Sequence, residues 1–360
     1  MPDPAAHARL LADYCLDVRP GQQIVVRSTT LAAPLLLALQ REILERGAWP
    51  LLRPALPGQD EAFWDIARDD HLDAFAPAEL AEIEGTDASV RIEAPHNATA
   101  LADVDPARMT RSARARRPLR EAASERRWCV SLWPTPALAQ QAGMSTGAFA
   151  ALVSRALFLD RPDPVAAWTE LSERQARLIE RLTRAREIRI EAPGTDLRLD
   201  VSDRTWINSD GRRNMPSGEV FTGPHESSAE GVVTFTVPAS PSGVSVTGVE
   251  LRFAGGRVVD ARADAGEAYL LETLDTDDGS RRLGELGIGT NFGLDRPTGM
   301  ILLDEKIGGT VHLALGRSYP ETGGVNESAV HWDLVCDLRR SGRLSADGDA
   351  ILVDGAFTAG

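Results

Sequence analysis

Two neighbouring polar side chains near the end of the chain have the types and the spacing of metal ligands. His331 and Asp333 lie in SAVHWDLVCD (328–337), in which every second residue from Val330 is apolar. Side chains alternate between the two faces of a strand, so the imidazole and the carboxylate point to the same side. Imidazole nitrogens and carboxylate oxygens bind divalent transition metals. The H-x-D pattern therefore predicts two ligands that are aimed at one point.

Three further residues of ligand type have neighbours that predict burial. His312, in GTVHLALG, shares its strand face with the small residues Thr310 and Ala314, which leave the ring room. Glu285 stands in LGELGIG and Glu219 in MPSGEVF. A buried glutamate costs free energy unless it is paired with a cation or bound to one. A single strand histidine is more often a hydrogen-bonded core residue, and for His312 this alternative stays open.

Other polar residues near these segments allow a structural and a functional interpretation. Lys306 is the only lysine among the 39 basic residues. We expect it to form an ion pair with Asp304 or Glu305, the alternative being that it binds a substrate carboxylate. His225 and Glu226, in GPHESSAEG, either line a specificity pocket or lie in a surface loop, and the loop is favoured.

The elements that position these residues fall into two halves. Before residue 166, helical periodicity alternates with short β-branched runs, which is the pattern of a doubly wound α/β domain with a largely parallel sheet. The expected helices there cover 6–18 and 34–46, and the expected strands cover 24–26, 49–52, 89–92 and 128–132.

A long charged helix over 168–186 is expected to connect the halves. Beyond it, alternating segments predict antiparallel strands, one helix over 265–274, and a final hairpin that turns at Asp347-Gly348. We therefore predict an N-terminal α/β domain (1–165), a connecting helix (166–187) and a β-rich α+β metal-binding domain (188–360).

Composition excludes several classes of function. The 360 residues include 39 basic and 53 acidic side chains, a net charge of −14 that argues against nucleic acid as the main partner. No apolar run is long enough to cross a bilayer, and the first residues do not resemble a secretory signal. Three widely spaced cysteines favour a reducing, cytoplasmic location.

The eight arginines of 108–127 are expected on a solvated or salt-bridged helix face. Gly287, Gly289 and Gly293 miss the dinucleotide-binding fingerprint.

Four motifs in one order resemble the aminopeptidase T, aminopeptidase S and PepS-like family of thermophilic-type metallo-aminopeptidases. They are NMPSGEVF (214–221), LGELGIGTN (283–291), DEKIGGTVHLALGRSY (304–319) and NESAVHWD (326–333). The segment YCLDVRPGQQIVV, near the start, also resembles the family's first domain. The likeness spans nearly all of the second half.

The resemblance implies a site and an activity. The five metal ligands would be Glu219, Glu285, His312, His331 and Asp333, which hold two divalent ions of Co, Zn, Mn or Mg. Glu285 is the implied bridge between the ions, and Glu285 and Tyr319 are the implied catalytic residues. Without the resemblance, the loop sequence RSYPETGG would favour a packing or turn role for Tyr319. The implied substrates are peptides with a free N-terminus, and the implied assembly is a homodimer.

Two other functions fit the same residues. A mononuclear Fe(II) ring-opening dioxygenase of the dihydroxypyridine type would need only His312, His331 and Asp333. The presence of both Glu219 and Glu285 speaks against it, because one iron gains nothing from two more buried acids. A non-catalytic, metal-dependent peptide-binding protein is the second alternative.

Overall fold

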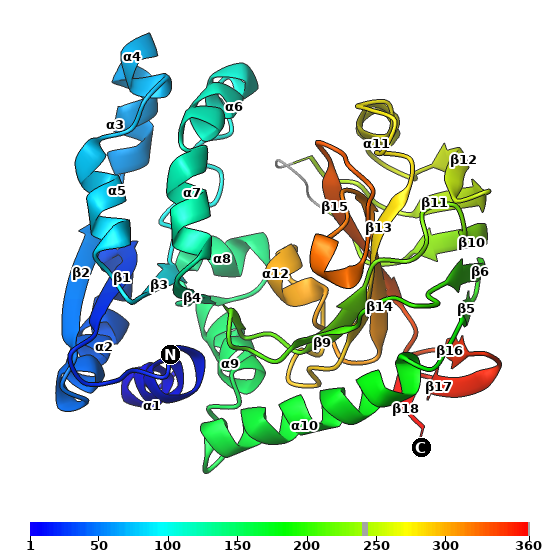
Figure 1. The fold of residues 1–360 in the computed structure, drawn as a ribbon, viewed down its shortest axis with the longest axis horizontal. Helices are drawn as coiled ribbons and strands as arrows, with labels where there is room; N and C mark the ends of the chain where they lie inside the picture. Colours follow the sequence, from blue (N-terminus) through cyan, green and yellow to red (C-terminus); the bar gives the residue numbers. More distant parts are fainter. Residues whose placement is uncertain (240–243, 359–360) are drawn as a thin grey trace. The chain divides into compact units, whose positions relative to one another are not determined.

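The computed structural model describes residues 1–239 and 244–358, shown in Figure 1. The chain forms two compact units. Unit 1 comprises Met1–Ala166 and Gly211–Pro216, and unit 2 comprises Ala167–Asp210 and Ser217–Gly360. Along 1–239 and 244–358, no helix is long and apolar enough to span a membrane.

Unit 1 is built on a parallel sheet with the strand order β2-β1-β3-β4-β8. Its strands are β1 (Gln23–Thr29), β2 (Trp49–Ala55), β3 (Ala88–Glu93), β4 (Arg127–Leu132) and β8 (Asn214–Met215). The helices are α1 (Pro4–Leu10), α2 (Ala33–Glu45), α3 (Gln59–Ile66), α4 (Asp69–Leu72), α5 (Pro77–Glu84), α6 (Pro106–Ala115), α7 (Arg117–Ser124), α8 (Pro136–Gln141) and α9 (Thr146–Ala156), with a 3-10 turn η2 (Thr30–Ala32).

Two details of unit 1 bear on the sequence predictions. The helix expected over 6–18 is α1 followed by a π-helical turn, η1 (Leu11–Cys15), in which the amide of Leu16 donates to the carbonyl of Leu11. The arginine-rich segment forms α6 and α7, whose side chains make ion pairs, Arg111 with Asp69 and Asp73 among them. The predicted salt-bridged helix face is thereby confirmed.

Unit 2 contains two antiparallel sheets. The first has the order β12-β11-β10-β6-β5-β16-β17-β18 and the second, which we call sheet C, has the order β15-β14-β13-β9-β7. The first comprises β5 (Glu187–Ala192), β6 (Thr195–Asp200), β10 (Glu230–Phe235), β11 (Val249–Ala254), β12 (Arg257–Arg262), β16 (Arg343–Ala346), β17 (Asp349–Val353) and β18 (Ala356–Phe357). Sheet C comprises β7 (Ile207–Ser209), β9 (Glu219–Thr222), β13 (Leu283–Gly289), β14 (Thr310–Gly316) and β15 (His331–Asp337).

The two longer helices of unit 2 agree with the expected pattern, with shifted ends, whereas a third, short helix was not expected. The long helix α10 (Pro164–Leu182) buries one side, which includes Trp168, Leu171, Gln175, Leu178 and Leu182. The others are α11 (Glu267–Leu274), α12 (Ile301–Asp304) and the 3-10 turn η4 (Pro320–Thr322). The expected hairpin turns at Asp347-Gly348, where both residues have positive φ, as a two-residue turn of type I′ requires. A parallel α/β sheet followed by a β-rich α+β unit confirms the predicted fold class.

The hydrophobic core of unit 2 determines which face of sheet C can carry polar groups. Leu286 of β13, Leu313 of β14 and Leu334 of β15 belong to one buried cluster with Ile190 and Phe253 of the other sheet. Because successive side chains of a strand alternate, the neighbours of these leucines point away from that core. The polar residues predicted as ligands lie on this second face.

Candidate metal centre

His312 is placed by the alternation of β14. Val311, Leu313 and Leu315 are buried in the core, so His312 points to the opposite face, where it is itself fully buried. Gly287 of β13 lies directly across from it in the ladder. A Cβ at position 287 would collide with the imidazole ring. The glycine-rich LGELGIG segment therefore makes space for a ligand side chain.

Glu285 reaches the same face through an irregularity of β13. Strict alternation would put Leu283 and Glu285 on one face, yet Leu283 is in the core. The register shifts between these two residues, which pairs Glu285 with Ala314, two residues from His312. A β-bulge of this kind redirects a side chain and is common beside functional sites.

His331 and Asp333 point to the same side of β15, as their spacing predicts. The Nδ1–H of His331 donates to the carbonyl oxygen of Arg317 at 2.8 Å. Because this bond places the proton on Nδ1, the lone pair of Nε2 is left for another partner. Such an arrangement is typical of histidines that bind metal.

The five predicted ligands form a row in which acids and histidines alternate. Glu285 is central, with Oε1 at 3.4 Å from Nε2 of His312 and Oε2 at 3.4 Å from Nε2 of His331. At one end, Oε2 of Glu219 is 3.6 Å from Nε2 of His312. At the other, Oδ2 of Asp333 is 3.6 Å from Nε2 of His331. The structure thus brings together every residue that the sequence predicted as a ligand.

A further acidic residue joins this row. Glu305 offers a carboxylate oxygen within 4.8 Å of ligand atoms of Glu219 and His312. The ammonium of Lys306 donates to Oε1 of Glu219 at 2.7 Å and to Glu305. The predicted ion pair with Glu305 is confirmed. Sequence reasoning missed the proximity of Glu305 to the ligands, although the D-E-K run, with the lone lysine beside it, was the available signal.

The other expected partner of Lys306 has a different role. Asp304 accepts hydrogen bonds from the amide and the hydroxyl of Thr298 and from the amide of Gly299. Burial raises its pKa to about 6 despite these donors. Asp304 therefore fixes the loop before α12.

Tyr319 lies at the end of the row near His331. Its hydroxyl is 3.4 Å from Nε2 of His331, and its ring packs against Phe221 with 5.6 Å between the centroids. Burial and the charges of Glu285 and Asp333 raise the pKa of the Tyr319 phenol. The hydroxyl therefore stays protonated and can donate a hydrogen bond.

The acidic surroundings control the protonation of both histidines. Burial alone would lower the pKa of His312, but its hydrogen bond to Glu285 and the charge of Glu219 raise the pKa to about 10. Burial also lowers the pKa of His331, but the hydrogen bond to Glu285 and the charge of Asp333 outweigh this effect and raise the pKa to about 9. The carboxylates thus attract positive charge strongly, whether it arrives as protons or as metal ions.

The row fits a metal centre in the type of its donor atoms and in the hydrogen-bond partners that some of these atoms lack. Within 1–239 and 244–358, the buried side-chain atoms without a hydrogen-bond partner include Oε2 of Glu219, Nδ1 of His312 and Oδ1 of Asp333. Buried polar atoms are nearly always satisfied, so the two orphaned carboxylate oxygens, which belong to the row, indicate an absent partner. Imidazole nitrogens and carboxylate oxygens without a thiolate suit divalent first-row metals, iron included.

His225 and Glu226 take the structural role that the sequence favoured. The guanidinium of Arg204 lies 3.2 Å from Nδ1 of His225 and donates to Oε2 of Glu226 at 2.9 Å. The other oxygen of Glu226 accepts from the amide of Val325. These contacts fix a loop, and neither residue lines the cavity beside the ligands.

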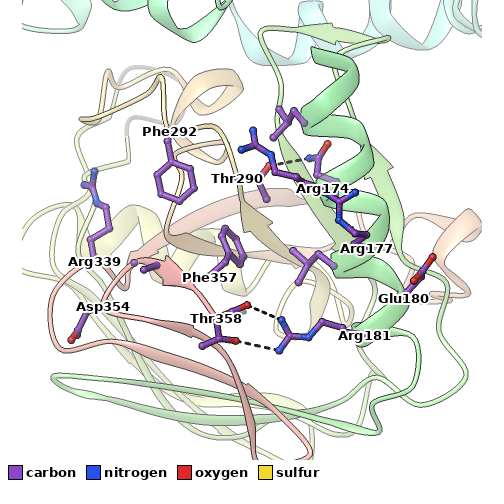
Figure 2. Close-up of a pocket in the computed structure, with 15 residues that line it drawn as sticks. Arg174, Arg177, Glu180, Arg181, Thr290, Phe292, Arg339, Asp354, Phe357 and Thr358 are labelled. Carbon is purple, nitrogen blue, oxygen red and sulfur yellow. Dashed lines mark hydrogen bonds between the residues drawn. The ribbon is translucent and has the colours of Figure 1, made fainter. Parts of the chain in front are cut away.

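Two cavities of unit 2 differ in their relation to the row. A cavity of about 210 Å³ is bordered by His331 and Asp333 and by the apolar side chains of Val237, Ile301 and Val335. A larger one, of about 890 Å³, lies along α10 and contains none of the five residues (Figure 2). Its wall includes Phe292 and Phe357 together with arginines such as Arg177 and Arg181. The smaller cavity is the one adjacent to the candidate centre.

Sequence comparison agrees with the geometry of this face. A profile of the thermophilic metalloprotease family (M29) matches residues 4–357. Aminopeptidase 2 from Geobacillus stearothermophilus is 33% identical over an alignment that covers 95% of this chain and 92% of that protein. Aminopeptidase T from Thermus aquaticus is 34% identical over 56% of this chain and 55% of that protein.

Solved structures give the same picture. Wild-type AmpT from Thermus thermophilus matches with a TM-score of 0.84 and 25% identity, over 99% of each chain. The 2,5-dihydroxypyridine dioxygenase from Pseudomonas putida KT2440 matches with a TM-score of 0.58 and 16% identity, over 99% of this chain and 97% of that one, and so shares the fold. The profile match over nearly the whole length and the identity with aminopeptidase 2 confirm the resemblance that the four motifs indicated: this chain belongs to the thermophilic metalloprotease family M29.

Proposed function

We propose that the chain is an aminopeptidase that removes N-terminal residues from peptides with two divalent metal ions bound by Glu219, Glu285, His312, His331 and Asp333. The observation that supports this most is the position of Glu285, whose two oxygens each face one histidine at 3.4 Å. A carboxylate between two imidazoles can bind two ions at once, so Glu285 is the proposed bridge. Family membership supports the activity, since the relatives named above are aminopeptidases.

Charge balance supports two ions rather than one. Two divalent ions bring four positive charges, and the carboxylates of Glu219, Glu285 and Asp333 together with one hydroxide offset them. Glu305 and Lys306 cancel each other. A buried centre needs such balance because an unpaired charge in a low-dielectric interior is strongly unfavourable. With a single ion, the same set of acids would carry excess negative charge.

The chain's own residues divide the chemical work. Bound divalent ions would supply polarisation of the scissile carbonyl and a water whose pKa falls towards about 7. Tyr319, protonated at neutral pH, donates a hydrogen bond to the negative charge that develops on the carbonyl oxygen. The carbonyl of Arg317 keeps His331 in one tautomer. The cavity of about 210 Å³ beside His331 receives the first side chain of the substrate.

Metal analysis combined with peptide hydrolysis tests the proposal. Protein stripped with a chelator is reconstituted with Co, Zn, Mn or Mg and supplied with short peptides. We expect two ions per chain, release of the first amino acid, and no reaction with N-acetylated peptides. The Glu285→Gln variant is expected to hold at most one ion and to lose hydrolysis while it keeps the far-ultraviolet circular dichroism of the wild type.

Other results would favour the rival functions. One iron per chain with oxygen consumption would support the ring-opening dioxygenase, with which the chain shares its fold. Peptide binding without hydrolysis by fully metal-loaded protein would support the binding protein. The presence of Glu219 and Glu285 in the row disfavours the single-iron centre. A homodimer, which the family resemblance implies, is part of the proposal and is tested by light scattering.

A further inference from the structure

Lys306 stands out by residue type and by place. It is the only lysine in a chain with 39 basic residues, and 1% of its side chain is exposed. Arginine serves at every other basic position. The two residues differ physically, because the ammonium is a compact point charge with three donors and the guanidinium is a wide planar fork. A single buried lysine in such a chain indicates a position that needs the compact cation.

The contacts of the ammonium divide the two oxygens of Glu219 into different roles. Oε1 accepts from Nζ of Lys306 at 2.7 Å. Oε2 has no hydrogen-bond partner among the described residues and faces Nε2 of His312 at 3.6 Å. A carboxylate with both oxygens available can bind a metal ion through either oxygen or through both. With Oε1 bound to Lys306, only Oε2 is presented to the row.

Glu305 completes the arrangement. It accepts a second hydrogen bond from the same ammonium and so helps to fix Nζ in place. Its negative charge offsets that of Lys306, so the pair orients Glu219 without a change in the net charge of the centre. This balance explains how a cation can lie beside a cation-binding site.

We propose that Lys306 is a positioning residue that holds Oε1 of Glu219 and thereby limits this ligand to a single metal-binding oxygen. The inference rests on the two-ion centre proposed above. It separates orientation from charge, because a residue that only balances charge could be replaced by arginine, whereas one that fixes a single oxygen could not.

Binding of Zn or Co to chelator-stripped protein, measured by calorimetry and by metal analysis after dialysis, tests the inference. In Lys306→Arg the charge is kept and the geometry is changed. We expect the dissociation constant of one of the two ions to rise by about ten-fold or more, the range seen when the partner of a metal ligand is lost, while that of the other ion is unchanged. Wild-type dissociation constants for both ions in Lys306→Arg would overturn the inference.

Two further variants keep the result interpretable. Arg204→Lys makes the reverse exchange at another buried basic residue of unit 2, paired with Glu226, and is expected to leave both dissociation constants unchanged. If Lys306→Arg does not fold, Lys306→Met combined with Glu305→Gln removes both charges and is expected to fold and still bind one ion weakly. Wild-type binding by that double variant would refute the inference. A wild-type protein that binds fewer than two ions would instead refute the proposed function.

Discussion

His331 shows how one side chain of the row is prepared for its task. Its Nδ1 donates to the carbonyl of Arg317, and its Nε2 faces Glu285, Asp333 and the hydroxyl of Tyr319. The backbone bond sets the tautomer and the ring orientation, so no rotamer search is needed when a ligand arrives. The Tyr319 hydroxyl lies close enough to Nε2 of His331 to donate a hydrogen bond to a group bound there.

Tyr319→Phe tests the hydroxyl alone. The change removes one oxygen and leaves the ring contact with Phe221. Because a donor to a developing oxyanion typically contributes 10²–10³ in rate, we expect kcat to fall by about 10²-fold with KM and metal content unchanged. Steady-state kinetics on a leucine amide substrate, together with metal analysis, measures this. An unchanged kcat would remove Tyr319 from the mechanism.

The strands place their ligands in two ways, by regular alternation and by a register shift, and only the alternation can be predicted from the sequence. The alternation of β14 and β15 was readable, so the placement of His312, His331 and Asp333 on one face followed from the apolar residues between them. The bulge of β13 was not readable. Simple alternation puts Leu283 and Glu285 together, and only the ladder with β14 shows the register shift that separates them.

The limits of sequence reasoning were those of long-range pairing. Glu305 precedes the only lysine, but its approach to Glu219 depends on a contact between segments 87 residues apart. Likewise, β8 pairs with β4 although Asn214 lies among residues whose pattern resembled the second half. Local periodicity carries no information about such pairings. The predicted domain limits at 165 and 187 therefore stay predictions, and the same holds for the roles of the individual site residues.

Gly287→Ala tests whether the glycine of β13 makes room for His312. The added Cβ would collide with the imidazole, so we expect a destabilisation of about 1–3 kcal/mol and weaker metal binding. Thermal unfolding and calorimetry measure the two effects. The matched control is Gly147→Ala in α9, where an added Cβ meets no atom within 4 Å, and it should leave stability unchanged or raise it by up to about 1 kcal/mol. Normal metal binding by Gly287→Ala would contradict the packing argument.

Ile301 of α12 tests the use of the smaller cavity. Its side chain is 45% exposed and borders the cavity beside His331 and Asp333, so a larger residue can be introduced there without a change in the core. We expect Ile301→Trp to lower kcat/KM at least about ten-fold for peptides that begin with leucine or phenylalanine, and to affect those that begin with alanine much less. A competition assay with mixed peptides measures the ratio. An equal loss for all peptides would show that the first side chain binds elsewhere.

At the scale of the whole molecule, an acidic chain concentrates part of its charge in one buried cluster. The net charge of −14 would become −14 + 4 = −10 with two divalent ions. We expect the remaining surface acidity to attract substrates that carry a free ammonium group. Without the ions, only protons can offset the negative charge of the cluster, so the stability of the metal-free protein depends on pH.

The pH dependence of the metal-free protein has a definite sign. The pKa of His312 is about 10 and that of His331 about 9 in the folded chain, against about 6.5 when unfolded. A raised histidine pKa stabilises the fold below the unfolded value, and this contribution is lost as the pH rises through the folded value. We therefore expect the melting temperature in chelator to fall as the pH rises from about 6.5 to about 10.

Metal-loaded protein should behave in the opposite way over the same range. Ions bind deprotonated histidines, so metal affinity rises with pH and offsets the loss. Melting curves at several pH values, with and without excess Zn or Co, measure the difference, and calorimetry in two buffers counts the protons released. Parallel curves with and without metal would show that the histidines are not ligands.

The burial of Lys306 also makes the chain unusual as a substrate for other proteases. An endoprotease that cuts only after lysine has a single cleavage point here, the bond between Lys306 and Ile307, in a segment where both residues are buried. Cleavage into 1–306 and 307–360 therefore requires this part of unit 2 to open. Bound ions would hold Glu219 in place, and Glu219 is the hydrogen-bond partner of Lys306. The rate of this single cleavage therefore reports how often the metal centre opens.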